Sequence, residues 1–257
     1  MAFPATQNKD YIVLGPDDYR TLGPQDFGSA GLTAVESIGP FVDIKVSGPL
    51  LTIHDSTIEP HLGIGHHPHR RNERIFYMES GQLDHSDSRN DITGHLEPGD
   101  LGLFTEGEAG MLHSEWNNGD RPSRIYILVY ATDPVPDQAA FNALRDADAP
   151  RYQEVEGVHT KQMVGPDSPL QVHGDIRFFA DSTLAEGAPL TLSTGETEGG
   201  LFAVREGTVG LDGHEVGPGG TILLPPADHA RDVTVHAKGP SRVIRVVHGP
   251  GFGFRTK

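Results

Sequence analysis

The chain has 257 residues, 36% of them hydrophobic and 22% charged, which is enough to build one large domain or two of ordinary size around a sizeable core. Its net charge of −16 argues against a nucleic-acid partner, and the absence of cysteine excludes disulfides, thiolate metal sites and thiol catalysis. The N-terminal segment lacks the basic and apolar regions of a secretory signal, and no apolar run reaches the ~18 residues of a membrane span, so we expect a cytoplasmic protein without membrane contact.

Short alternating or apolar runs recur along the chain with turn residues between them. Such runs predict β-strands, and the 32 glycines and 20 prolines supply the turns that many short strands need. We therefore predict an all-β protein. The runs are FVDIKV, LLTIHD, RIFYMES, DLGLFTE and RIYILVYA in the first half, and GLFAVRE, TVGLDG, TILLPP, DVTVHA and SRVIRVVHG in the second.

One stretch, residues 133–157, breaks this pattern. Proline opens it, QAAFNALRDA within it has helical spacing, and a second proline follows. We predict a linker with one short helix that joins an N-terminal metal-binding domain (1–140) to a C-terminal domain (141–257). The boundary falls within 133–160.

An internal repeat supports two domains. The segments ESGQLDHSDSRNDITGHLEPGDLGLF and REGTVGLDGHEVGPGGTILL both run strand, glycine, strand, turn, Pro-Gly and apolar strand. Two copies of one such unit predict two small antiparallel barrels or sandwiches in tandem. The matched positions are Gly81 with Gly207, Gly99 with Gly219 and, past the last strand, His113 with His229.

Two pairs of side chains in the first copy have the spacing of metal ligands. His67 and His69 are two residues apart, so on a strand they point to one face. Pro68 favours extended geometry for His67 and removes a ladder donor, which predicts an edge or bulged strand. His113 and Glu115 repeat the same spacing in MLHSEW.

Imidazole and carboxylate groups without sulfur suit Fe(II), Mn(II), Ni(II), Zn(II) or Cu(II). Three histidines and one carboxylate leave coordination positions open, which is typical of catalytic sites. Glu73 shares the parity of His67 and His69 and is a second candidate carboxylate. The alternative is chance pairing in a chain with 14 histidines.

The remaining histidines fit no such pattern. His66 has the opposite parity to His67 and is expected to face away from the site. The second copy retains a histidine only at His229, and one histidine cannot hold a metal, so we expect a C-terminal domain without a metal site. Surface or loop positions are predicted for His61, His85 and His95.

The stretch HPHRRNERIFYMESGQLDH, followed by PGDLGLFTEGEAGMLHSEW, resembles the pirin family of bicupins. That family's pattern is HPH-R-G-F-E, a strand, a glycine turn, PGD, a TAG-x-G loop and H-S-E or H-A-E. The resemblance is strong over residues 65–116 and weaker elsewhere. It implies two cupin-type barrels and Fe(II) held by His67, His69, His113 and Glu115. The general cupin pattern would use Glu73 as the carboxylate ligand instead.

The chain departs from this pattern in two places beside the proposed metal. Arg71 and Asn72 stand where the family has Gly-Phe, and the TAG-x-G loop contains Glu106 and Glu108. These side chains either alter substrate preference or point to solvent and change nothing. Trp116, which follows Glu115, would point away from the metal into the core.

The resemblance implies two functions. Several bacterial members resemble quercetin 2,3-dioxygenases, in which a flavonol such as quercetin binds the metal and O₂ opens its central ring. Here the metal would lower the pKa of the flavonol hydroxyl, and Glu115 or Glu73 would act as the general base. The alternative is a non-enzymatic, iron-dependent regulator that acts through protein partners, as animal pirins do. A third reading is a hydrolase or isomerase in which another metal activates water.

Overall fold

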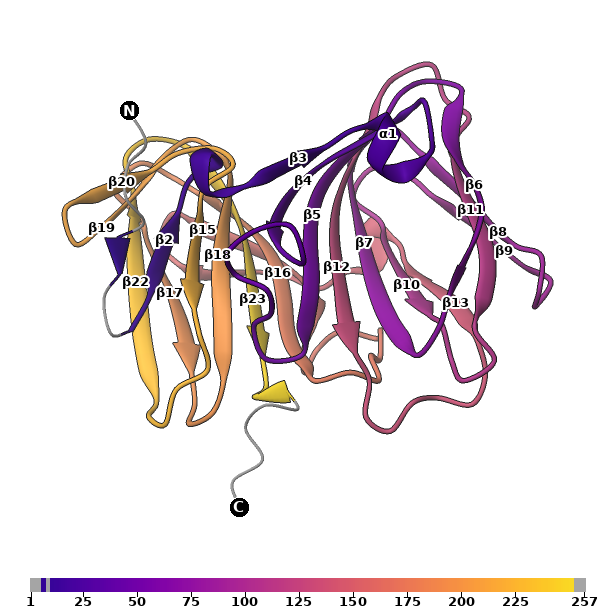
Figure 1. Ribbon diagram of the computed structural model, residues 1–257. Coiled ribbons are helices and arrows are strands. Elements are labelled where there is room, and N and C mark those ends of the chain that lie inside the picture. Colours follow the sequence, from indigo (N-terminus) through magenta and orange to yellow (C-terminus); the bar gives the residue numbers. More distant parts are fainter. Residues whose placement is uncertain (1–5, 8–9, 252–257) are drawn as a thin grey trace.

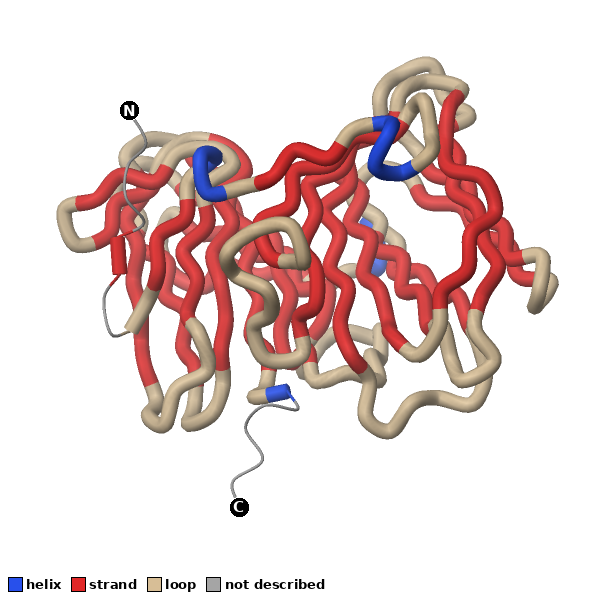
Figure 2. The backbone as a smooth tube through the Cα atoms, viewed as in Figure 1, coloured by secondary structure: helices blue, strands red, loops and turns tan. Residues whose placement is uncertain are grey.

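The computed structural model describes residues 6–7 and 10–251, and nearly all of its regular secondary structure is β-strand. Figure 1 shows two β-barrels side by side, and Figure 2 shows how little of the backbone is helical. The prediction of an all-β protein with two tandem antiparallel barrels is confirmed. Within the described residues, no helix is both long and apolar enough to cross a membrane.

The N-terminal barrel consists of two antiparallel sheets. Its large sheet has seven strands in the order β13-β10-β7-β12-β5-β4-β3, and its small sheet has four in the order β6-β11-β8-β9. The strands are β3 (Arg20–Leu22), β4 (Leu32–Ile38), β5 (Leu50–Ile58), β6 (Leu62–His69), β7 (Asn72–Ser80), β8 (Leu83–Asp87), β9 (Ile92–Leu96), β10 (Leu101–Thr105), β11 (Met111–Asn117), β12 (Ser123–Ala131) and β13 (Ala140–Leu144).

The C-terminal barrel repeats this plan. Its large sheet has the order β1-β2-β21-β18-β23-β16-β15-β14, and its small sheet has the order β17-β22-β19-β20. The strands are β1 (Thr6–Gln7), β2 (Ile12–Leu14), β14 (Arg151–Val155), β15 (Val158–Val164), β16 (Ile176–Leu184), β17 (Pro189–Thr194), β18 (Gly199–Glu206), β19 (Val209–Leu211), β20 (His214–Val216), β21 (Thr221–Leu224), β22 (Arg231–Ala237) and β23 (Ser241–His248). The helical segments are α1 (Pro24–Phe27) and the 3-10 turns η1 (Pro16–Asp18) and η2 (Asp146–Asp148).

The glycine turns of the repeat occupy equivalent places in the two barrels. Gly81 joins β7 to β8 with φ of 72°, and Gly207 joins β18 to β19 with φ of 71°. A Cβ at Gly81 would lie 2.6 Å from Ser123, and one at Gly207 would lie 2.4 Å from Ser241. Both backbone conformation and space therefore require glycine.

Two predictions from the sequence are wrong: one concerns a helix, and the other concerns the barrel to which the first strands belong. The helix expected in QAAFNALRDA is strand β13, which pairs with β10 from Leu101↔Leu144 to Thr105↔Ala140 and is followed by the turn η2. Backbone pairing along a sheet edge overrides the helix propensity of the four alanines in QAAFNALRDA. The first strands also do not join the N-terminal barrel, because β2 pairs with β21 of the C-terminal sheet.

Three apolar cores result from this arrangement. The first lies between the two large sheets and joins the barrels, with Tyr77, Tyr130 and Phe179 among its members. The second fills the C-terminal barrel with leucine and valine side chains. The third lies inside the N-terminal barrel, where it leaves room for a cavity beside β6 and β11.

Candidate metal centre

The proposed ligands lie on two neighbouring strands of the small N-terminal sheet. β6 and β11 are antiparallel, with His67 opposite His113 and His69 opposite Met111. β6 is the edge strand, as Pro68 predicts. The register shifts between His113 and Glu115, a bulge that adjusts the direction of the carboxylate.

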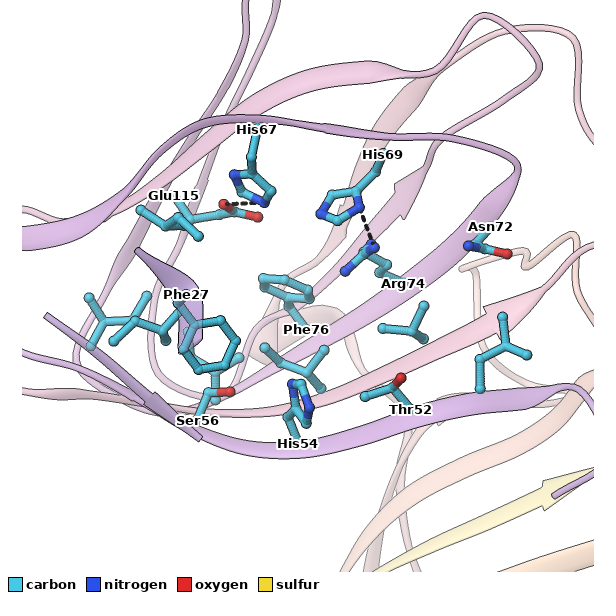
Figure 3. A pocket seen from close by; sticks show the side chains of 17 residues that line it. Phe27, Thr52, His54, Ser56, His67, His69, Asn72, Arg74, Phe76 and Glu115 are labelled. Atoms are coloured by element: carbon cyan, nitrogen blue, oxygen red, sulfur yellow. Dashed lines mark hydrogen bonds and ion pairs between the residues drawn. The ribbon is translucent and has the colours of Figure 1, made fainter. Parts of the chain in front are cut away.

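The structure brings all four predicted ligands together. The imidazole centroids of His67, His69 and His113 are separated by 4.6 to 5.0 Å. The carboxylate of Glu115 lies 3.4 Å from Nε2 of His113 and 3.8 Å from Nε2 of His67. Figure 3 shows His67, His69 and Glu115 pointing into one cavity. Among the described residues, the three histidines form the one group with metal-ligand spacing.

The chemistry of this donor set fits a divalent cation. Nε2 of His113 and Oε2 of Glu115 are buried and have no hydrogen-bond partner, a costly state that a bound ion would relieve. Burial lowers the pKa of all three histidines, which keeps their nitrogen lone pairs available for a metal. Burial also raises the pKa of Glu115 to about 7, while Arg74 acts in the opposite direction.

Outer contacts orient two of the imidazole rings. Nδ1 of His67 donates to the carbonyl of Gly65 at 2.9 Å, which leaves Nε2 directed toward the site. Nδ1 of His113 lies 3.2 Å from Nε2 of His85. The ring of His85 stacks on Phe141 at 5.3 Å.

The expectation that His85 lies at the surface is wrong. His85 is buried, and burial lowers its pKa to about 4, so the ring is neutral and its Nε2 can accept the proton of His113 Nδ1. The residue stands directly opposite Glu115 in the β8–β11 pairing. Sequence reasoning missed it because its partner, His113, is 28 positions away; the alternation of His85 with Asp87 on a strand was the available signal.

The prediction that Glu73 faces the same site is also wrong. Glu73 is the second residue of β7, and its carboxylate points between the barrels, where it accepts hydrogen bonds from Thr105, Tyr130 and the backbone amide of His173. Parity cannot be counted from β6 into β7, because a turn at residues 70–71 restarts the alternation. Every acceptor position of Glu73 is used away from the cavity.

The side chain on β7 that faces the metal histidines is Arg74. Its Nη2 donates to Nδ1 of His69 at 2.7 Å, and its Nε donates to Oε1 of Glu106 at 2.6 Å (Figure 3 labels Arg74 and His69). Glu106 is fully buried and also accepts from the backbone amide of Asn72 at 2.8 Å. One of the two added loop carboxylates therefore lies behind the cavity wall and holds Arg74 in place.

The other departures from the family pattern divide between cavity and solvent. Asn72 lines the cavity. Arg71 has φ of 74°, a conformation that suits glycine, and its exposed guanidinium pairs with Glu108 at 2.8 Å. Arg71 and Glu108 thus point to solvent, whereas Asn72 and Glu106 do not.

The remaining sequence predictions have mixed outcomes. His66 is exposed, as its parity predicts, and so is His61, whereas His95 is half-buried. Trp116 points away from the metal but is 39% exposed, so its expected place in the core is wrong. In the second copy, His229 pairs with Asp10 and Asp228 at 3.0 Å each.

The cavity beside the histidines has a volume of about 400 Å³, which is within the range of small-molecule sites. Apolar side chains form most of its wall, including Phe27, Phe76 and Ile127. His54 lies on the wall opposite the metal histidines (Figure 3), with its Nε2 3.0 Å from Glu36. The cavity is therefore polar at two opposite ends and apolar between them.

Comparison with known proteins agrees with this fold. Residues 25–128 match the family model described as Pirin. The chain is 26% identical over 217 residues to Pirin-1 of Arabidopsis thaliana, a match that covers 79% of this chain and 72% of that protein. It is 24% identical over 201 residues to quercetin 2,3-dioxygenase of Escherichia coli K12, with coverage of 76% and 80%.

Solved structures share the fold. A quercetin 2,3-dioxygenase from Acinetobacter baumannii superimposes with a TM-score of 0.74 at 20% identity, over 86% of this chain and 81% of that one. A bacterial pirin from Escherichia coli in complex with nickel(II) superimposes with a TM-score of 0.71 at 19% identity, over 90% and 99%.

Proposed function

This chain belongs to the pirin family of bicupins, and from that premise we propose that it is an Fe(II)-dependent dioxygenase that cleaves a flavonol such as quercetin. His67, His69, His113 and Glu115 would hold the metal, which supplies a Lewis acid with open coordination positions. Relatives named quercetin 2,3-dioxygenase and pirin support a metal protein of this family. The choice of Fe(II) and of the substrate is part of the proposal, since the neighbour solved with a metal contains nickel.

The residues of this chain would divide the work as follows. The apolar wall binds a planar aromatic body and excludes water from it. Glu115, whose pKa burial raises to about 7, accepts the proton of the substrate hydroxyl. His85 holds the ring of His113 in place through its hydrogen bond at 3.2 Å.

The observation that carries this proposal is the pair of buried, unpartnered acceptors. Glu115 lines the mostly apolar cavity, and Nε2 of His113 lies 3.4 Å from its carboxylate. Buried polar atoms that only support the fold would instead have hydrogen-bond partners within the protein. This arrangement suits a metal that also contacts a bound substrate.

The test is to incubate the iron-loaded protein with quercetin under O₂. Loss of the flavonol absorbance and release of CO measure the reaction. We expect turnover by the wild type, and loss of both bound iron and turnover in His69→Ala. His66→Ala is the matched control, because it changes an exposed histidine of the same strand. No turnover of several flavonols at full iron occupancy would refute the dioxygenase and favour the regulatory alternative.

A further inference from the structure

Arg74 gives the cavity a cationic group that the metal chemistry does not require. Among the described residues that line the cavity, it is the one arginine or lysine. Its side chain is 15% exposed and lies against His69, as the dashed line in Figure 3 shows. Glu106 fixes the guanidinium from behind through Nε, and because that carboxylate is fully buried, the pair is held rigidly.

The hydrogen bond between Arg74 and His69 depends on which ring nitrogen carries the proton. A guanidinium can only donate, so Nδ1 of His69 accepts in this arrangement and the ring proton lies on Nε2. A metal on Nε2 would place the ring proton on Nδ1. Arg74 could then no longer donate to His69, and its terminal nitrogens would need another acceptor.

The nearest space for that acceptor is the cavity. Nη1 of Arg74 has no hydrogen-bond partner within the described part of the chain, and the rest of the wall around it is mostly apolar. A substrate oxygen that carries negative charge would satisfy both Arg74 and the metal. The aromatic rings of Phe27 and Phe76 would contact the body of the same molecule.

We propose that Arg74 and the bound metal form one subsite for the anionic oxygens of the substrate. The cavity then selects aromatic molecules with an acidic enol or carboxylate next to a second oxygen, and binds their neutral analogues weakly. This inference rests on the proposed metal site, but not on the ring-opening reaction. A flavonol, with adjacent hydroxyl and keto oxygens, is one member of this class.

The experiment compares two probes of equal shape, 1-hydroxy-2-naphthoate and 1-hydroxy-2-naphthamide, by calorimetric titration of the nickel-loaded protein. We expect the wild type to bind the acid about 10- to 100-fold more tightly than the amide, since a hydrogen bond to a charged group is worth that difference. Arg74→Met should reduce this preference about 10-fold, since the metal remains, and leave the amide affinity within about threefold. Bound nickel is measured for each protein to show that the metal site is intact.

Two further variants make the outcome decisive. Arg74→Met leaves Glu106 buried without its partner, so Arg74→Met/Glu106→Gln tests the same loss without an unpaired charge. Arg71→Met removes an exposed arginine of the same turn and should bind both probes as the wild type does. A preference for the acid that is undiminished in both Arg74 variants would overturn the inference.

The same set separates this inference from the proposed reaction. Acid binding that depends on Arg74, together with no flavonol turnover, would refute the dioxygenase and keep the anionic subsite. Normal quercetin turnover in Arg74→Met, together with no acid preference in the wild type, would refute the subsite and keep the dioxygenase.

Discussion

At the scale of single residues, the metal centre depends on side chains behind the ligands as much as on the ligands. His85 contacts His113, Phe104 and Phe141, and it has no other role in the cavity. Its burial keeps the ring neutral, so it acts as an acceptor that holds the His113 ring in one orientation. Such a residue positions a ligand without touching the substrate.

Replacing His85 with phenylalanine should therefore weaken metal binding and leave the fold intact. His85→Phe keeps an aromatic ring against Phe141 but removes the acceptor for His113, so we expect nickel affinity to fall about 10- to 100-fold. Calorimetric titration with Ni(II) measures the affinity, and circular dichroism checks the fold. His95→Phe, at a half-buried site on the next strand, is the control. Equal nickel affinity in His85→Phe and wild type would contradict a positioning role.

At the scale of elements, the local spacing of the ligands was readable from the sequence and their wider surroundings were not. HPH on an edge strand and H-S-E on its neighbour follow from period-two alternation and one proline. The predicted direction of Glu73 is wrong because a turn separates β6 from β7. The predicted helix in QAAFNALRDA is wrong because this segment pairs with the edge of β10 as a strand. Both errors arise where tertiary contacts decide, and a local pattern contains no such information.

The close approach of β6 to β11 gives a second prediction. A Cβ at Gly63 would lie 2.2 Å from the carbonyl oxygen of Glu115, whereas one at Gly65 meets nothing within 4 Å. Gly63→Ala must therefore force the two ligand strands apart, which should cost about 1–3 kcal/mol of unfolding free energy and weaken nickel binding.

Gly65→Ala is the matched control on the same strand, with an expected change within about 0.5 kcal/mol. Urea denaturation with and without Ni(II) measures both effects. If the two variants behaved alike, contact between β6 and β11 at Gly63 would not limit the site.

At the scale of the whole molecule, the two barrels are joined by both apolar and polar contacts. The large sheets share one continuous core, and Arg205 of the C-terminal barrel donates to Glu79 and Asp55 of the N-terminal barrel. The tandem arrangement was predictable from the repeat, because each copy contains a glycine turn after its first strand that the structure places equivalently. The sharing of one core could not be predicted, since it depends on which sheet faces meet.

His248 makes this joint sensitive to pH. It is fully buried at the end of β23, and its Nε2 lies 3.2 Å from the hydroxyl of Ser47 in the N-terminal barrel. Burial lowers its pKa to about 4, against about 6.5 in an unfolded chain. Between these two pKa values the unfolded state binds a proton at His248 that the folded state does not bind. The contribution of neutral His248 to the unfolding free energy is therefore complete above pH 6.5 and is lost as the pH falls toward 4.

The size of this loss is about 3 kcal/mol for His248. His248→Gln cannot take up that proton, so the difference in unfolding free energy between wild type and variant should change by about this amount between pH 7 and pH 4. Denaturant titrations at a series of pH values measure it. A difference that stays constant with pH would show that His248 is not the group responsible.

The pairing of β2 with β21 has a consequence for how the chain can be divided. In this pairing Ile12 lies opposite Leu223 and Leu14 lies opposite Thr221. Strand β2 therefore pairs with a strand that is more than 200 residues later in the sequence. A fragment cut between the barrels, such as residues 141–257, would leave β21 as a bare sheet edge open to pairing with other chains. All strands of the N-terminal barrel, β3 to β13, lie in one continuous stretch, whereas the C-terminal barrel takes strands from both ends of the chain. The C-terminal barrel is therefore complete only after the whole sequence has been made.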